Sequence, residues 1–170
     1  MKPRTGDYAQ YYDRYINLLP DEDILKILED QMNSSEKFLK SISEDKGSYS
    51  YAEGKWTVKE VIGHVIDVER VMAYRALSFS RGEKQSLPGF EQDDYIANGN
   101  YNERNIDDLA NEFKAVRNAN LFMFKNYSEE MLKQSGIASD NNVTVLALIY
   151  IIAGHEKHHM TILKEGYLKK

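Results

Sequence analysis

Three of the four histidines in this sequence lie in one short segment near its end, in a pattern typical of a metal site. The segment GHEKHH spans residues 154–159 and contains His155, His158 and His159. On a helix, His155 and His159 are one turn apart on the same face, as in a two-histidine metal clamp. His158 lies about 100° round the helix from His159, so we expect it at the surface or behind the ligands. We predict that the fold brings the fourth histidine, His64, to this pair.

A site of this kind would hold one divalent metal ion. Three neutral imidazoles on one side of an ion leave positions open for water or substrate, which is typical of a catalytic site. The predicted ligands are His64, His155 and His159, and an ordinary buried histidine is the alternative for each of them. The chain has no cysteine, which excludes thiolate ligands and a cysteine nucleophile. Among imidazole-binding metals we expect zinc, with nickel next.

Two charged residues are candidate catalytic groups. Asp67 follows His64 by three residues and shares its helical face, so it could orient an imidazole, act as a fourth ligand or move a proton. A plain surface carboxylate is the alternative. Arg117 falls within an apolar helical series, which suggests an anion or carboxylate partner. Its alternative is a side chain that extends to solvent.

The segment HEKHH also matches the H-E-x-x-H signature of zinc proteases, with Glu156 as the base. That pattern is short and common by chance. Such proteases take a third ligand from further along the chain and use a scaffold that contains a sheet. Only eleven residues follow His159, and the helical pattern provides no sheet, so we discard this interpretation.

Helical periodicity predicts an all-α fold with four long helices that position these residues. A short helix within 7–19 carries a stripe of tyrosines and should pack on the bundle as a strap; a substrate-stacking surface is the alternative. Thr57 and Glu60 form a predicted capping box, Gly82 a C-terminal stop, and Asn142 a predicted cap. The expected long helices span about 21–45, 57–81, 106–127 and 143–165, and Gly166 is expected to stop the last one. The segments between them, including 128–142, are expected to be irregular and to contain no strand.

Connection lengths predict how the four helices run. A helix of about 25 residues is roughly 37 Å long, and only the connection 83–104 spans such a length with ease. We therefore predict an up-down-down-up four-helix bundle with a long crossover between its second and third helices. The second and fourth helices are then antiparallel, and His64 arrives at the height of the histidine pair.

Composition limits the classes of partner. The chain of 170 residues is expected to form a single domain, 1–170, large enough for a hydrophobic core. Its net charge of −5 and its lack of a basic run argue against nucleic acid as a partner. No apolar stretch of membrane-spanning length and no signal peptide are evident, so we expect a cytoplasmic protein that does not engage membranes. The exposed tyrosine segment makes a homodimer reasonable.

Several segments resemble the DinB-like superfamily, the DinB/YfiT-type metal-dependent hydrolases. The matching pieces are GKWTVKEVIGHVIDVERVMAYRAL at 54–77, LPGFEQDDYI at 87–96, EFKAVR at 112–117 and IIAGHEKHHMTILKEGYL at 151–168. The resemblance implies a four-helix bundle of up-down-down-up order whose metal ligands correspond to His64, His155 and His159.

The same resemblance implies a metal-dependent enzyme with a small-molecule substrate. Some members of the superfamily resemble thiol S-transferases, in which a metal activates a low-molecular-weight thiol cosubstrate such as bacillithiol, mycothiol or glutathione. Others resemble isomerases of thiol adducts or hydrolases. Arg117 would suit the carboxylate of a thiol, whereas Asp67 would suit proton removal from water. The alternative is a non-enzymatic metal-binding or stress-response bundle.

Overall fold

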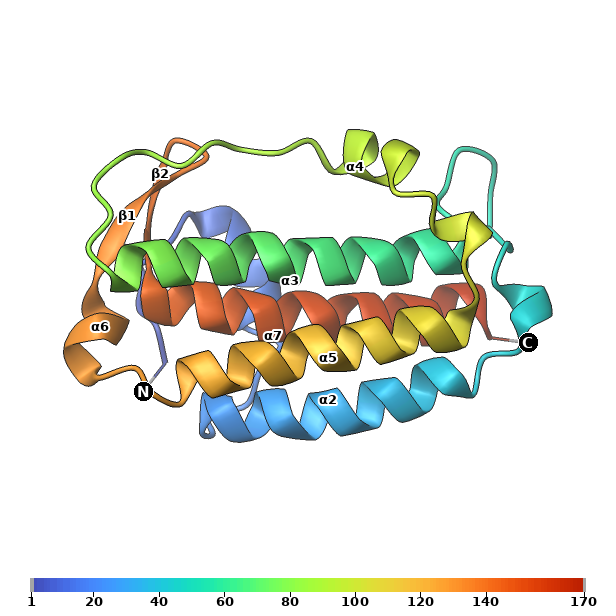
Figure 1. Cartoon of the computed structure of the whole chain (residues 1–170), viewed down its shortest axis with the longest axis horizontal. Helices are drawn as coiled ribbons and strands as arrows, with labels where there is room; N and C mark the ends of the chain where they lie inside the picture. The colour runs from blue at the N-terminus through green and yellow to red at the C-terminus, as the bar shows by residue number, and fades with distance from the viewer. Residues whose placement is uncertain (1, 170) are drawn as a thin grey trace.

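The computed structural model describes residues 2–169, and four long helices dominate it (Figure 1). These are α2 (Ile24–Lys40), α3 (Val58–Ser80), α5 (Ile106–Phe124) and α7 (Val145–Ile162). In Figure 1, α2 and α7 run in one direction while α3 and α5 run in the other, which is the predicted up-down-down-up order. The main packing partners are α3 with α7 and α2 with α5. The predicted all-α four-helix bundle is confirmed.

The long crossover between α3 and α5 returns along the outside of the bundle and makes the parallel pair possible (Figure 1). It contains the short helix α4 (Gln92–Asn98) and a 3₁₀ turn, η3 (Tyr101–Glu103). In the described part of the chain, no helix combines the length and apolar character needed to cross a membrane.

Local sequence explains where the helices begin. The predicted capping box is present at α3: the Thr57 hydroxyl accepts from the Glu60 backbone N–H, and the Glu60 carboxylate accepts from the Thr57 N–H at 2.7 Å. Gly82 follows α3 with a φ of +85°, a conformation that suits glycine. The predicted cap Asn142 is wrong, because Thr144 caps α7 by accepting from the Ala147 N–H at 3.1 Å.

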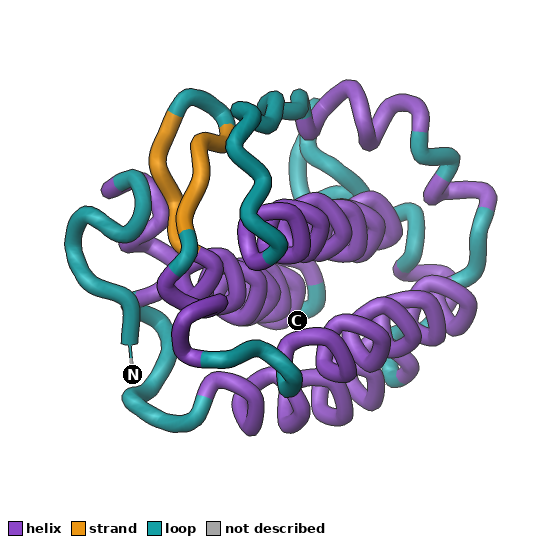
Figure 2. The backbone as a smooth tube through the Cα atoms, turned by 60° about the vertical axis from the view of Figure 1, so that its left-hand side comes forward, coloured by secondary structure: helices purple, strands orange, loops and turns teal. Residues whose placement is uncertain are grey.

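A two-stranded antiparallel hairpin occupies part of the segment predicted to be irregular. The strands are β1 (Ser135–Ala138) and β2 (Asn141–Thr144), and they stand at one end of the bundle (Figure 2). Ser139 and Asp140 both have positive φ, as a two-residue hairpin turn requires. Strands this short leave too little alternation for recognition from the sequence, and Asn142 lies in one of them.

The two ends of the chain also differ in detail from the prediction. The tyrosine-rich segment forms a 3₁₀ turn, η1 (Gln10–Tyr12), and a one-turn helix, α1 (Asp13–Ile16), which packs on α7. After α7 the chain continues as a π-helical turn, η4 (Leu163–Tyr167), so Gly166 does not stop the helix. No added Cβ would meet another atom at Gly166, which leaves the local backbone free to wind on.

Polar side chains divide the core into two apolar clusters. One cluster contains Leu28, Phe79 and Leu148, and the other contains Leu39, Phe113 and Leu163. On each long helix, buried polar residues lie at or beside the point where one cluster gives way to the other. We call this set the polar layer: Ser35, His64, Glu69, Arg117, His155, Glu156 and His159. It crosses the bundle at mid-height and contains the predicted site.

Candidate metal centre

The three predicted ligands converge. His64 comes from α3 and His155 and His159 from α7, and each offers a ring nitrogen that lies within 4.8 Å of the others. The Nε2 atoms of His64 and His155 are 3.0 Å apart. Ring centroids are separated by 4.9 Å for His64 and His155, 4.8 Å for His64 and His159, and 4.4 Å for His155 and His159. The antiparallel arrangement of α3 and α7 therefore places the three rings at one height.

The environment keeps these imidazoles neutral. Burial lowers the pKa of His64 to about 4, against the opposing charge of Asp93, and lowers that of His159 to about 3, with His64 and His158 adding to the effect. Burial and the neighbouring histidines hold the pKa of His155 well below its ordinary value. A metal ligand must present a free lone pair, so little proton competition is expected at neutral pH.

The donor set fits a divalent ion. Two nitrogens about 2.1 Å from one tetrahedral ion lie roughly 3.4 Å apart, and the 3.0 Å between the Nε2 atoms of His64 and His155 is within a few tenths of an ångström of that spacing. Nδ1 of His159 is buried and has no hydrogen-bond partner among residues 2–169. A cluster of neutral nitrogen donors with an unpaired buried atom suits Zn²⁺ or Ni²⁺ better than the oxygen-seeking Mg²⁺ or Ca²⁺.

The glycines that precede two of the histidines permit close packing. A Cβ on Gly154 would overlap the backbone of Tyr15 in α1, and one on Gly63 would overlap the ring of Tyr101 in η3. The close neighbours at these two positions are the crossover and α1 rather than another long helix. These segments therefore press against the backbone beside His155 and His64.

His158 and Asp67 lie beside the cluster without joining it. Within residues 2–169, the group of converging ligand atoms contains neither of them. His158 packs edge-on against Tyr15, with ring centroids 5.4 Å apart. The Asp67 carboxylate accepts a hydrogen bond from the Tyr101 hydroxyl. Asp67 is thus not placed as a fourth ligand, and a role in positioning Tyr101 beside Gly63 fits its contacts better.

Arg117 does not occupy the place expected for a substrate-binding residue. Its side chain is fully buried, which excludes extension to solvent. Nε and Nη2 donate to the two carboxylate oxygens of Glu69 at 2.8 and 2.9 Å, and Nη1 donates to the Leu28 carbonyl at 3.2 Å. The expected carboxylate partner exists, but it belongs to the protein. All three guanidinium nitrogens of Arg117 thus have partners inside the core.

Glu156 also faces the core. It is buried, and one carboxylate oxygen accepts from the Ser35 hydroxyl. Burial raises the pKa of this carboxyl, while Arg117 and Ser35 oppose the shift. Among the described residues, those lining the hollows beside the histidines do not include Glu156. This placement agrees with the rejection of the protease signature.

Two hollows adjoin the histidines, one on each side. The first, of about 340 Å³, reaches His64 and His155 and is walled by tyrosines of the N-terminal segment, by α3 and by residues 89–92 of the crossover. The second, also about 340 Å³, reaches His159 and includes Trp56 and Asp93. Both hollows include residues of the crossover, so each lies between the crossover and the bundle.

Sequence reasoning missed two residues in these hollows. Arg75 lines the first together with His64, and Asp93 lines the second together with His159. Arg75 follows His64 by eleven residues, or about three turns, so it lies on the same stripe of α3. The position of this arginine on the same helical stripe as His64 could have been recognised from the sequence. Asp93 lies in the crossover, where no periodicity could have placed it.

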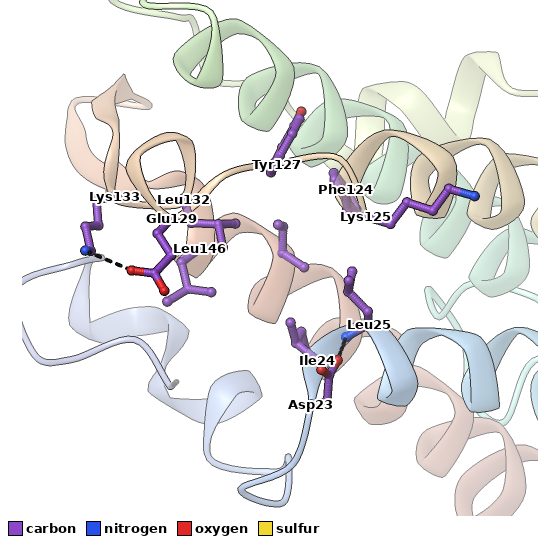
Figure 3. A pocket seen from close by; sticks show the side chains of 11 residues that line it. Asp23, Ile24, Leu25, Phe124, Lys125, Tyr127, Glu129, Leu132, Lys133 and Leu146 are labelled. Atoms are coloured by element: carbon purple, nitrogen blue, oxygen red, sulfur yellow. Dashed lines mark hydrogen bonds and ion pairs between the residues drawn. The ribbon is translucent and has the colours of Figure 1, made fainter.

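A third hollow lies away from the histidines. It has a volume of about 270 Å³, and its lining residues include Leu25, Phe124, Leu132 and Leu146 from α2, α5, α6 (Glu129–Lys133) and α7 (Figure 3). Its charged lining residues include Lys133, which pairs with Glu129, as Figure 3 shows. Within residues 2–169, its lining contains no histidine. It offers an apolar space without a reactive group.

Fold and site together define an all-α bundle that brings three histidines to one point. A family model described as the DinB superfamily matches residues 27–163, and the chain belongs to this superfamily. A protein of Oceanobacillus iheyensis named "Putative metal-dependent hydrolase" is 24% identical over 141 residues, which are 82% of this chain and 81% of the relative. The chain thus belongs to a family with members named as metal-dependent hydrolases.

Solved structures share the fold. YfiT from Bacillus subtilis, described as a probable metal-dependent hydrolase with an unusual four-helix bundle topology, aligns with a TM-score of 0.76. The alignment has 14% identity and covers 97% of this chain and 90% of that chain. A mycothiol-dependent maleylpyruvate isomerase aligns with a TM-score of 0.67 and 17% identity, over 85% of this chain and 61% of that chain. At these identities the likeness establishes the fold alone.

Proposed function

We propose that the protein is a metal-dependent enzyme in which His64, His155 and His159 hold one divalent ion, zinc or else nickel. The observation that carries this proposal is the convergence of three ring nitrogens within 4.8 Å, two of them from residues that line a hollow. A divalent ion held there supplies a Lewis acid that lowers the pKa of a coordinated water or thiol, so that its anion exists near neutral pH. The substrate is a small molecule, since the adjoining hollow measures about 340 Å³.

Transfer of a low-molecular-weight thiol to an electrophile is the reaction that the residues favour. Sulfur would form a bond to the electrophilic carbon as the leaving group departs, and the thiol proton would pass to solvent or to an exposed carboxylate. A thiol ionises far more readily than water and needs less help from a base. Glu156 is engaged by Ser35 and Asp67 by Tyr101, so neither carboxylate is free for that task.

Hydrolysis is the second candidate, and Asp93 is the observation that favours it. Asp93 is exposed and lines the hollow that contains His159, and its charge raises the pKa of His64 against the stronger effect of burial. An exposed carboxylate beside the ligands could accept the proton of an attacking water. The name of the Oceanobacillus relative supports the same reaction class.

Elemental analysis of purified protein tests the metal. We expect one equivalent of zinc or nickel in the wild type and loss of that metal in His64→Ala and His159→Ala. His158→Ala is the matched control, because His158 is adjacent on α7 but lies outside the converging group, and it should retain the metal. A wild type that takes up no metal would favour a non-enzymatic module.

Turnover separates the two reactions. Monochlorobimane or chlorodinitrobenzene should be conjugated in the presence of bacillithiol, mycothiol or glutathione, and the rate should fall in Asp93→Asn by no more than a few-fold. Thiol-independent cleavage of an ester that is strongly reduced in Asp93→Asn would instead support hydrolysis. In both cases, His158→Ala should behave as the wild type.

A further inference from the structure

Arg75 is a buried cation whose surroundings differ from those of Arg117. Its side chain is buried, with 3% of its surface exposed, and it lines the hollow that reaches His64 and His155. Within residues 2–169, none of the ion pairs includes it. Arg117, equally buried, has the two oxygens of Glu69. A buried cation without a counter-charge is costly, so its retention needs an explanation.

The hydrogen bonds of Arg75 leave one side of the guanidinium available. Nη2 donates to the Pro88 carbonyl at 2.8 Å and to the Ser139 hydroxyl at 2.9 Å, which fixes the group against the crossover and the hairpin. Nη1 makes only a long contact of 3.7 Å to the Met72 sulfur, and in the described part of the chain Nε makes no hydrogen bond of ordinary distance and angle. The Tyr12 hydroxyl is a polar neighbour of the guanidinium. The available donors therefore lie on a guanidinium whose orientation is already fixed.

Helix geometry directs this cation toward the histidines. His64, Val68, Met72 and Arg75 follow one another at intervals of three or four residues along α3, and all four line the same hollow. Helical side chains lean toward the N-terminus of their helix. The eleven residues from His64 to Arg75 span about 16 Å of axis, and this lean makes the distance between their functional groups shorter. One elongated molecule can contact both ends.

We propose that Arg75 binds the carboxylate of the substrate or thiol cosubstrate whose other end reacts at the histidine cluster. The inference rests on the proposed function for the chemistry at the end that reacts. The anion site itself is inferred from the contacts of Arg75 alone. A carboxylate matches the planar fork of a guanidinium. A phosphate dianion fits less well, because Glu91 lines the same hollow and no second buried cation does within residues 2–169.

The walls of the hollow suit the part of the molecule between its ends. Tyr12 and Tyr15 line it on one side and Met72 and Ile151 on the other, so the middle section meets aromatic and apolar surface. Burial raises the pKa of Tyr12 although Arg75 opposes the shift, which shows that the hydroxyl and guanidinium share one environment. The substrate class is therefore an elongated carboxylate with a thiol, or a group susceptible to attack, at its far end.

Paired metal-binding probes test this assignment on the zinc-loaded protein. Adipic monohydroxamic acid and hexanohydroxamic acid carry the same hydroxamate, but only the first carries a carboxylate. Calorimetry should show about tenfold tighter binding of the carboxylate probe to the wild type. The two affinities should become equal in Arg75→Met and stay different in Arg81→Met, a matched control at the exposed end of the same helix. Equal affinities in the wild type would overturn the proposal.

A second measurement uses the metal-free wild type, so it depends neither on metal binding nor on the folding of a variant. The Arg75 Nε resonance of the ¹⁵N-labelled, chelator-treated wild type is followed during titration with glutarate, and inorganic phosphate serves as the comparison. A saturable shift with glutarate, larger than with phosphate, supports a carboxylate site even if the protein binds no metal. A larger response to phosphate would reassign the anion, and no response to either would remove the site. Failure of metal binding and failure of the Arg75 proposal are thus distinguishable.

Discussion

The polar layer has two halves that treat burial in opposite ways. In one half, Arg117 and Glu69 form a bidentate ion pair, and Asn120 adds a hydrogen bond to the same carboxylate at 3.1 Å. In the other, three imidazoles face one another and Nδ1 of His159 has no partner among the described residues. Glu156, whose Oε2 also lacks a partner among the described residues, belongs to neither half. The Arg117–Glu69 pair has its partners within the protein and is called the complete half, whereas the imidazole cluster keeps an unpartnered nitrogen and is called the incomplete half. The difference separates charges that stabilise the bundle from groups kept ready to bind.

The largest effect should come from breaking the complete half. Arg117→Met leaves the Glu69 carboxylate buried without its cation, so the free energy of unfolding should fall by about 3–5 kcal/mol in urea titrations. Arg75→Met is the control, since no buried carboxylate depends on Arg75, and it should cost far less. Adding Glu69→Gln to Arg117→Met should recover part of the loss. Similar losses in the two single variants would contradict the contrast between the arginines.

The incomplete half should make the metal-free protein sensitive to acid. Burial lowers the pKa of His64 from 6.5 to about 4, so between these values the unfolded chain binds more protons than the folded protein. The stabilisation is complete above pH 6.5 and is lost as the pH falls toward 4 and below, by roughly 3 to 3.5 kcal/mol for this residue.

Urea titrations over a series of pH values with chelator present measure this slope. His64→Gln should flatten it, and His158→Gln, at a less buried position, should flatten it less. A wild-type slope that His64→Gln leaves unchanged would show that the pKa of His64 is not depressed.

Packing against α1 should show a smaller effect. In Gly154→Ala the new methyl group would overlap the Tyr15 backbone, so we expect a loss of about 1–2 kcal/mol as α1 is displaced. Gly166→Ala meets no neighbouring atom and provides the control. The melting temperatures of both variants provide the measurement. If Gly154→Ala were as stable as the control, α1 would not be tightly packed on α7 in solution.

The smallest effect concerns Asp67. We expect Tyr101→Phe, which removes the hydrogen bond, to cost about 1 kcal/mol, and Asp67→Asn, which replaces the charged acceptor with a neutral one, to cost no more; both should retain similar turnover. Chemical unfolding and steady-state rates of the two variants can be compared directly. A large loss of turnover in Asp67→Asn alone would restore the role in proton transfer first predicted for this carboxylate.

The sequence was sufficient for the features that depend on periodicity and chain length. The spacing of His155 and His159, the place of His64 in its helix and the length of the segment 83–104 together predict the antiparallel pair and the meeting of the rings. Contacts made by the crossover could not be predicted in this way. The place of Asp93 and the contact of Arg75 with Pro88 depend on how residues 87–93 lie over the bundle, and its contact with Ser139 depends on the hairpin; no repeat specifies either.

Arg117 shows a different limit. The sequence indicates a cation within an apolar stripe and hence a carboxylate partner, but several carboxylates on three other helices could serve. Only the rotation of α3 about its axis decides that Glu69 faces Arg117 while Asp67 faces Tyr101. The same rotation sends His64 and Arg75 into a common hollow. A small error in the predicted rotation of α3 is therefore enough to assign a functional role to a residue that is structural.

The incomplete half of the polar layer is tested most directly by a crystal of the purified protein measured at the zinc and nickel absorption edges. We expect one anomalous peak at about 2.1 Å from a ring nitrogen of His64, His155 and His159, with His158 and Arg117 outside the coordination sphere. A metal bound elsewhere, or no anomalous peak in protein supplied with both metals, would contradict a three-histidine centre.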